Sequence, residues 1–160
     1  MNRKLVVTLV AVVLLLSLAG MSPAAAQSAL PSQVMSAVQA GILDEYNAYN
    51  LYQAVLDQFG PVRLFMNIQA AEAQHIAAWQ RIFSQYAIPL PQVPVLDQKP
   101  RFATRFAACE AAVNAEMTNV KLYDNMLKTV SAYPDIVRVV TALRNASQTR
   151  HLPAFQRCAG

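Results

Sequence analysis

Two short motifs in the sequence place a polar side chain three residues before a histidine. They are Glu72-Ala73-Gln74-His75 and Gln148-Thr149-Arg150-His151, and they contain both histidines of the chain. On an α-helix, side chains three residues apart lie on the same face. Carboxylates and imidazoles are suitable ligands for iron, manganese and zinc. The motifs therefore predict a metal-binding site, provided that the fold brings the two helices together.

Two further glutamates fit the same chemistry. Glu45 and Glu116 are each followed seven residues later by a tyrosine, and seven residues are about two turns of one helix face. In metal-binding four-helix bundles, two helices supply one Glu each and the other two supply Glu-x-x-His. The predicted ligands are Glu45, Glu72, His75, Glu116, Gln148 and His151, with Tyr52 and Tyr123 on the same faces.

The elements that must position these residues are helices. Apolar residues recur at steps of three and four in four segments, and no alternating strand pattern competes with them. Four prolines between Ile88 and Pro100 predict an extended connection, and Pro153 is expected to loosen the last helix. The sequence predicts an all-α antiparallel four-helix bundle, built from two helical hairpins joined by this long crossover. The expected helices span 32–59, 61 to just before Pro89, about 101–130, and 135 to about 157.

Residue counting places the predicted ligands at one height in the bundle. Glu45 is 15 residues before the turn at Gly60, and Glu72 is 12 residues after it. At roughly 1.5 Å per residue, those two levels differ by about one turn. The second hairpin gives the same result for Glu116 and Gln148. All four helices can therefore contribute to one site.

The two cysteines fit the same register. Cys109 is seven residues before Glu116, and Cys158 is seven residues after His151. Because consecutive helices of a hairpin run in opposite directions, these two shifts lead to the same end of the bundle. An exported chain meets an oxidising compartment, so we expect a disulfide between Cys109 and Cys158.

Residues 1–26 have the layout of a secretory signal peptide. A short positive start is followed by the apolar run 5–19 and by Ala24-Ala25-Ala26 as a cleavage site. We expect a linker at 27–32, the helical bundle at 33–158, and a periplasmic or secreted protein. A retained N-terminal anchor is the alternative.

The composition of the remaining chain excludes two function classes. Removing residues 1–26 lowers the net charge from +4 to +2, because Arg3 and Lys4 are the only charged residues there. The other basic residues are scattered among acidic ones, which is not the pattern of a nucleic-acid-binding surface. No other segment is long and apolar enough to span a membrane.

The motifs resemble those of the ferritin-like superfamily, which includes the rubrerythrins and bacterioferritins. The chain is more closely similar to a small family of ferritin-like bacterial and archaeal domains without an assigned function. The likeness covers about residues 33–157. It is carried by the stretches Phe59-Gly60-Pro61, Asn67-Ile68, Glu72-Ala73-Gln74-His75 and His151-Leu152-Pro153-Ala154-Phe155.

This resemblance implies a di-metal site on Glu45, Glu72, His75, Glu116 and His151. Gln148 departs from the pattern, because it stands where a second bridging carboxylate is expected. Two ferrous ions with three carboxylates keep a net charge of +1, which is unfavourable in a low-dielectric core. One tightly held ion, with a weaker second site, is the implied arrangement.

Two functions of different classes follow from these observations. The first is an exported ferritin-like protein that binds one or two iron or manganese ions, with ferroxidase or peroxide-scavenging activity. The second is a metal-free bundle with a polar core network, serving as a structural or partner-binding module of the envelope. A homodimer is compatible with either one, and the sequence does not decide the oligomeric state. Glu110 lies about 120° around its helix from Glu116, so it is expected at the surface or as a helix cap.

Overall fold

The structure is a computed structural model that describes residues 30–95 and 99–160. The expected signal peptide at 1–26 and positions 27–29 of the expected linker lie outside the described residues. Within the described ranges all regular structure is helical. The elements are α1 (Ser32–Phe59), α2 (Arg63–Gln85), α3 (Arg105–Thr129), α4 (Pro134–Ala146), the π-helical turn η1 (Ser147–His151) and α5 (Leu152–Cys158).

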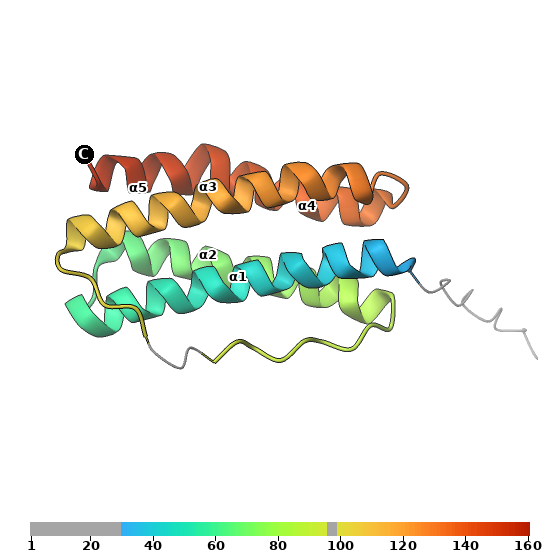
Figure 1. The fold of residues 1–160 in the computed structure, drawn as a ribbon, viewed down its shortest axis with the longest axis horizontal. Coiled ribbons are helices and arrows are strands. Elements are labelled where there is room, and N and C mark those ends of the chain that lie inside the picture. The colour runs from blue at the N-terminus through green and yellow to red at the C-terminus, as the bar shows by residue number, and fades with distance from the viewer. Residues whose placement is uncertain (1–29, 96–98) are drawn as a thin grey trace, which may run out of the picture.

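The helices form a four-membered bundle in which α4, η1 and α5 together make the fourth member (Figure 1). The hairpin of α1 and α2 packs against the hairpin of α3 with α4, η1 and α5 chiefly through α1 with α3 and α2 with α4. The described parts of the chain between α2 and α3, residues 86–95 and 99–104, extend along the bundle (Figure 1). The predicted all-α four-helix bundle with a long crossover is confirmed. None of the described helices is long and apolar enough to cross a membrane.

Two helices begin later than the sequence predicts. Helix α2 begins at Arg63, because Gly60 takes a positive φ of 77° and Pro61 lies within the turn rather than in the helix. Helix α3 begins at Arg105 instead of about residue 101, and the hydroxyl of Thr104 caps it by accepting a hydrogen bond from the Ala107 amide at 3.1 Å. The backbone of Phe102 pairs with the side chain of Gln58 at 2.6 and 3.0 Å, which fixes the end of the crossover to α1.

The fourth member is interrupted, where the sequence predicts one helix to about residue 157. A single π-helical turn, η1, separates α4 from α5. Pro153 is the second residue after it, and a proline in an α-helix lacks the amide hydrogen and clashes with the carbonyl four residues earlier. The wider π-turn moves that carbonyl, which belongs to Thr149, away from the ring.

The core consists of two apolar clusters with a polar layer between them. One cluster includes Ile42, Trp79 and Ile136, and the other includes Phe65 and Phe155. Every helical member passes from one cluster to the other through buried polar residues. These polar residues are Glu45, Glu72, His75, Glu116, Asn119, Ser147 and His151.

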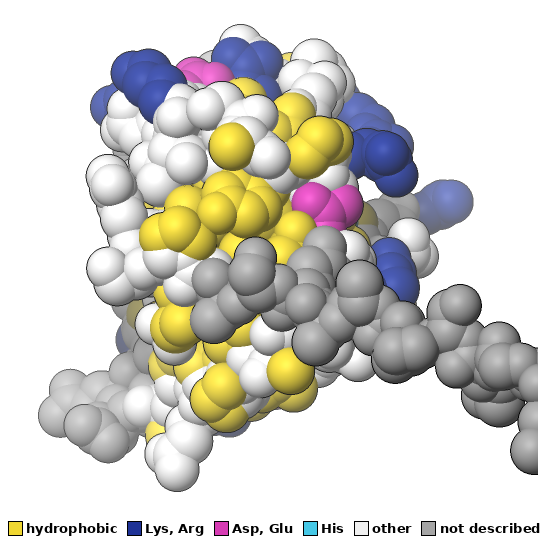
Figure 2. Space-filling model, turned by 90° about the vertical axis from the view of Figure 1, so that its right-hand side faces the viewer, with side chains coloured by type: hydrophobic (Ala, Val, Ile, Leu, Met, Phe, Trp, Pro, Cys, Tyr) yellow, Lys and Arg dark blue, Asp and Glu magenta, His cyan; other side chains and the backbone are white. Residues whose placement is uncertain are grey.

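The three- and four-residue period of apolar residues predicts Phe106 on the buried face of α3, and the structure contradicts this prediction. Phe106 is 50% exposed, whereas Cys109 and Ala112 are buried in its place. Glu110 is exposed on this helix, as expected. At the end of the bundle shown in Figure 2, hydrophobic side chains gather down the middle of the face, so the apolar core extends to the surface there.

Cys109 of α3 and Cys158 of α5 form a disulfide with their Cα atoms 5.8 Å apart, which confirms the predicted pair. It joins the two helices at the end of the hairpin opposite its turn. The bridge closes a loop between residues 49 positions apart. A loop of this length contributes about 4 kcal/mol in the chain-entropy account of disulfides.

Replacing both cysteines in Cys109→Ser/Cys158→Ser should therefore lower the free energy of unfolding by up to about 4 kcal/mol. Urea unfolding followed by circular dichroism measures this change. Wild type in reducing agent is the matched control and should shift by the same amount. An unfolding midpoint that neither treatment changes would contradict the role of the bridge.

Candidate metal centre

Five of the six predicted ligands lie together in the polar layer of the core. Glu45 comes from α1, Glu72 and His75 from α2, Glu116 from α3 and His151 from the end of η1. All five side chains are buried. They form two groups in which the potential ligand atoms lie within 4.8 Å of one another.

The first group contains Glu45, Glu72 and His75. Nδ1 of His75 lies 2.7 Å from Oε2 of Glu72 and 3.1 Å from Oε2 of Glu45. Glu72 precedes His75 by three residues on α2, so both point from one face, as the motif predicts. Glu45 reaches the same imidazole from α1.

The second group contains Glu72, Glu116 and His151. Nδ1 of His151 lies 3.1 Å from Oε1 of Glu72 and 3.4 Å from Oε1 of Glu116. Neither contact has hydrogen-bond geometry, so this buried nitrogen has no hydrogen-bond partner. A buried ring nitrogen that faces two carboxylates without a hydrogen bond has the position of a metal ligand.

Glu72 belongs to both groups. Its Oε2 faces His75 and its Oε1 faces His151, and the two imidazole rings stack with centroids 5.5 Å apart. One carboxylate thus lies between two Glu–His pairs. This is the arrangement in which a carboxylate bridges two ions.

The two tyrosines act across the bundle rather than along their own helices. The Tyr52 hydroxyl of α1 donates to Oε1 of Glu116 on α3 at 2.6 Å, and the Tyr123 hydroxyl of α3 donates to Oε1 of Glu45 on α1. Within one helix, seven residues separate a Glu from its Tyr by about 10 Å, too far for contact. Because α1 and α3 run in opposite directions, equal steps of seven bring each tyrosine to the glutamate of the other helix.

The expectation that Gln148 faces the core is wrong, since its side chain is exposed. A π-turn holds more residues than an α-turn, so residues three apart no longer share a face. Ser147, four residues before His151, is buried instead. The second hairpin therefore has no carboxylate three or four residues before its histidine, unlike the first.

Two residues next to the predicted ligands were missed. Nδ2 of Asn119 donates to Oδ2 of Asp44 at 2.7 Å and lies 3.4 Å from Oε1 of Glu45. Asn119 is buried and Asp44 is half-buried. Their positions carry a weak pattern, because Asn119 follows Glu116 by three residues and Asp44 directly precedes Glu45. The three- and four-residue period of apolar residues on α3 predicts Val120 on its buried face, but Val120 is only half-buried and Asn119 is buried beside it.

The ionised groups of the centre shift one another's pKa. Burial lowers the pKa of an imidazole, but contacts with Glu45 and Glu72 outweigh it and raise the pKa of His75 to about 10. Burial is likewise outweighed by Glu116 and Glu72, which raise the pKa of His151 to about 9. Burial raises the pKa of Glu45, whereas in Glu72 the two histidines overcome burial and lower the pKa.

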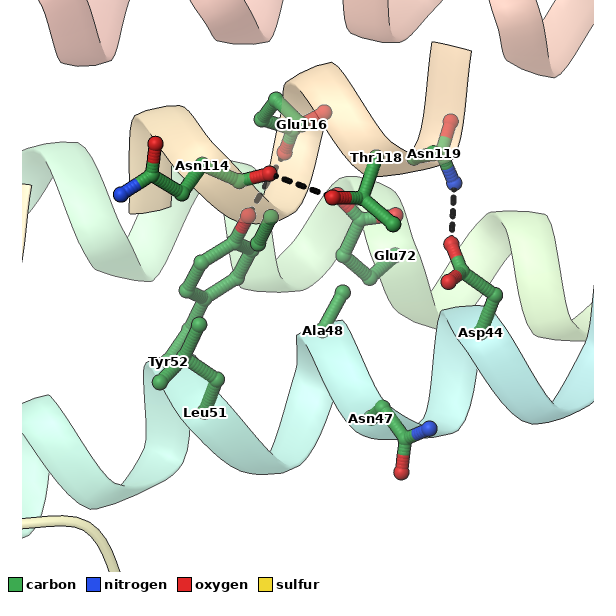
Figure 3. Close-up of a pocket in the computed structure, with 11 residues that line it drawn as sticks. Asp44, Asn47, Ala48, Leu51, Tyr52, Glu72, Asn114, Glu116, Thr118 and Asn119 are labelled. Atoms are coloured by element: carbon green, nitrogen blue, oxygen red, sulfur yellow. Dashed lines mark hydrogen bonds between the residues drawn. The ribbon is translucent and has the colours of Figure 1, made fainter. Parts of the chain in front are cut away.

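Two pockets reach the centre. The carboxylate pocket, of about 290 Å³, lies between α1 and α3, and Glu72, Glu116 and Tyr52 are among the residues that line it (Figure 3). The imidazole pocket, of about 350 Å³, lies between α2 and the η1–α5 segment and is lined by His75 and His151 among others. The buried ligands are thus reached through different pairs of helices.

Comparison with known proteins supports the fold alone. No protein-family model and no curated protein matches the chain. Among solved structures it is similar to the crystal structure of hypothetical protein MJ0754 from Methanococcus jannaschii DSM 2661. The TM-score is 0.73 at 18% identity, over 83% of each chain. An all-helical bundle with a buried carboxylate–histidine cluster is compatible with a ferritin-like protein.

The raised histidine pKa values set the pH dependence of the metal-free protein. Each imidazolium is stabilised by its carboxylates in the folded state, so its contribution is fully present below its ordinary pKa of 6.5. That contribution is lost as the pH rises through about 9 to 10. The raised pKa of Glu45 acts in the same direction, because its ionisation disfavours the folded state.

The melting temperature in the presence of a chelator should therefore fall between pH 6.5 and pH 10. Thermal unfolding followed by circular dichroism measures it. The double variant His75→Gln/His151→Gln is the control, and its melting temperature should change less over this interval. A wild-type melting temperature that is flat or rising with pH would contradict the ion pairs.

Proposed function

We propose that this protein binds one or two transition-metal ions, iron or manganese, in the core of its bundle. The observation that carries the proposal is Glu72, whose two oxygens face two separate Glu–His pairs. Nδ1 of His151 supports it, because this nitrogen faces oxygens of Glu72 and Glu116 at 3.1 and 3.4 Å without hydrogen-bond geometry. Mixed carboxylate and imidazole ligands fit both metals.

The two ion positions are unequal. Glu45, Glu72 and His75 would hold the first ion, and Glu116 and His151 would hold a second with the shared Glu72. The second hairpin has no carboxylate three or four residues before its histidine, so three carboxylates face two divalent ions with a net charge of +1. That excess is costly in a buried site, which favours one tightly held ion and a weaker second one.

The residues around the ligands have a positioning role. The hydroxyls of Tyr52 and Tyr123 orient Glu116 and Glu45, and the Trp79 indole donates to the Tyr123 oxygen at 3.0 Å. Bound iron would supply redox chemistry toward dioxygen or peroxide. The protein would hold the ion away from bulk water, with access through the two pockets. In this proposal the chain is a ferritin-like protein with ferroxidase or peroxide-scavenging activity.

Metal analysis by plasma mass spectrometry tests the proposal on protein purified without chelator. Wild type should carry one or two equivalents of iron or manganese, and His75→Ala should lose the first. Gln148→Ala and Glu110→Gln are matched controls at exposed positions and should retain wild-type metal content. His151→Ala should lower a content of two equivalents toward one.

Wild type without bound metal, which also fails to take up Fe(II) or Mn(II), would contradict the proposal. The alternative function, a metal-free bundle with a structural or partner-binding role, would then hold. One observation favours this alternative. Nδ1 of His75 lies within hydrogen-bond distance of Glu45 and Glu72, and its raised pKa favours the protonated imidazole, so the polar layer can be satisfied without an ion.

We further propose that the protein is exported to the periplasm or secreted. The support is the signal-peptide layout of residues 1–26 and the disulfide between Cys109 and Cys158, which is typical of oxidising compartments. Intact mass measurement of protein from the periplasmic fraction of a bacterial host should show a chain that begins at residue 27. A full-length chain retained in the cytoplasm would contradict export.

A further inference from the structure

The two pockets that reach the centre differ in charge. Every charged residue that lines the carboxylate pocket is acidic, namely Asp44, Glu72 and Glu116. The imidazole pocket has no carboxylate in its lining, and its exposed charged residue is Arg150. A cation is therefore attracted to the first pocket and repelled from the rim of the second.

The carboxylate pocket leads from exposed amides and a hydroxyl to buried carboxylates. Its exposed rim is formed by Asn47, Asn114 and Thr118, and Glu72 and Glu116 are buried at its inner end. Figure 3 shows Glu72 of α2 between the residues of α1 and those of α3. Ala48, Leu51 and Ala115 also line the pocket, so oxygen atoms stand at its rim and at its inner end rather than along the whole path. A hydrated divalent cation can exchange water for the carboxylate ligands at that inner end.

Asp44 has a defined place in this pocket. Its carboxylate is half-buried on the α1 wall, and Asn119 of α3 holds it by the hydrogen bond of 2.7 Å (Figure 3). It directly precedes Glu45 and is none of the five residues assigned to the centre. The buried Oδ1 of Asn119 has no hydrogen-bond partner.

We propose that the carboxylate pocket is the entrance for the divalent cation and that Asp44 captures the ion before it reaches Glu72 and Glu116. This inference rests on the proposed metal binding. In this inference the two pockets have different roles, because the cation enters through the carboxylate pocket between α1 and α3. The opposite side, between α2 and the η1–α5 segment, is left for uncharged or anionic molecules.

The chain contains a natural reporter of metal entry. Trp79 is its single tryptophan, and its indole is linked through Tyr123 to Glu45 of the centre. Paramagnetic Co(II) bound at the centre should quench this fluorescence. Stopped-flow mixing of the metal-free protein with Co(II) then gives the rate of entry, and equilibrium dialysis gives the amount bound.

Two lysine substitutions, one at each pocket rim, add the same charge and so show through which pocket Co(II) enters. Thr118→Lys adds a positive charge at the rim of the carboxylate pocket, and Gln74→Lys adds one at the rim of the imidazole pocket. We expect Thr118→Lys and Asp44→Asn each to slow Co(II) entry about tenfold at low salt, with less effect at high salt. Co(II) should enter the Gln74→Lys variant at the wild-type rate. At equilibrium the Thr118→Lys variant should bind as much Co(II) as wild type.

Four results would overturn the inference. The assignment of the carboxylate pocket as the entrance is wrong if Gln74→Lys slows Co(II) entry as much as Thr118→Lys does. It is also wrong if neither variant slows Co(II) entry. The proposed capture of the ion by Asp44 is wrong if Co(II) enters the Asp44→Asn variant at the wild-type rate. Wild type that binds no Co(II), Fe(II) or Mn(II) in dialysis would instead overturn the metal proposal itself, and the entrance with it.

Discussion

The burial of three carboxylates and two imidazoles in one layer of the core is the constraint on which this structure depends. An isolated charge in a protein interior is strongly unfavourable, so each group needs partners of opposite charge or hydrogen-bond donors within reach. Those partners come from all four members of the bundle. The two hairpins therefore cannot shift relative to one another without leaving a buried charge uncompensated. The apolar clusters on either side keep water from the layer and strengthen every contact within it.

The two hairpins contribute the same types of residue to the polar layer, except at one position. Each hairpin supplies a glutamate and a tyrosine from its first helix and a histidine from its second, and each tyrosine serves the other hairpin's glutamate. An aromatic residue follows each histidine by four positions, Trp79 in one half and Phe155 in the other, and each packs against a tyrosine ring. The carboxylate of Glu72 has no counterpart in the second hairpin. This difference makes the two Glu–His pairs chemically unequal.

Much of the fold and of the centre could be predicted because periodicity and residue counting report on regular helices. On the second helix, for example, the predicted ligands Glu72 and His75 are both buried as expected. Residue counting gave the wrong buried residue where the helix is irregular. The π-turn η1 holds an extra residue, so Ser147 is buried instead of Gln148. Contacts between helices were also beyond the sequence. Nothing in the spacing of Tyr52 and Glu45 shows that each pairs across the bundle, or that Asn119 of α3 holds Asp44 of α1.

The π-turn also sets the orientation of everything that follows it in the chain. The buried positions Leu143, Ser147, His151 and Phe155 are four residues apart, and in a plain α-helix each such step would drift by about 40° around the axis. The wider turn absorbs part of that drift, so Phe155 still packs beside Tyr52 and Cys158 still meets Cys109. Cys158 and His151 consequently face the bundle from the same side of their helical member only because of η1. Shortening this segment by one residue would rotate the whole C-terminal helix, and the oxidised chain would then have to strain either its disulfide or its polar layer.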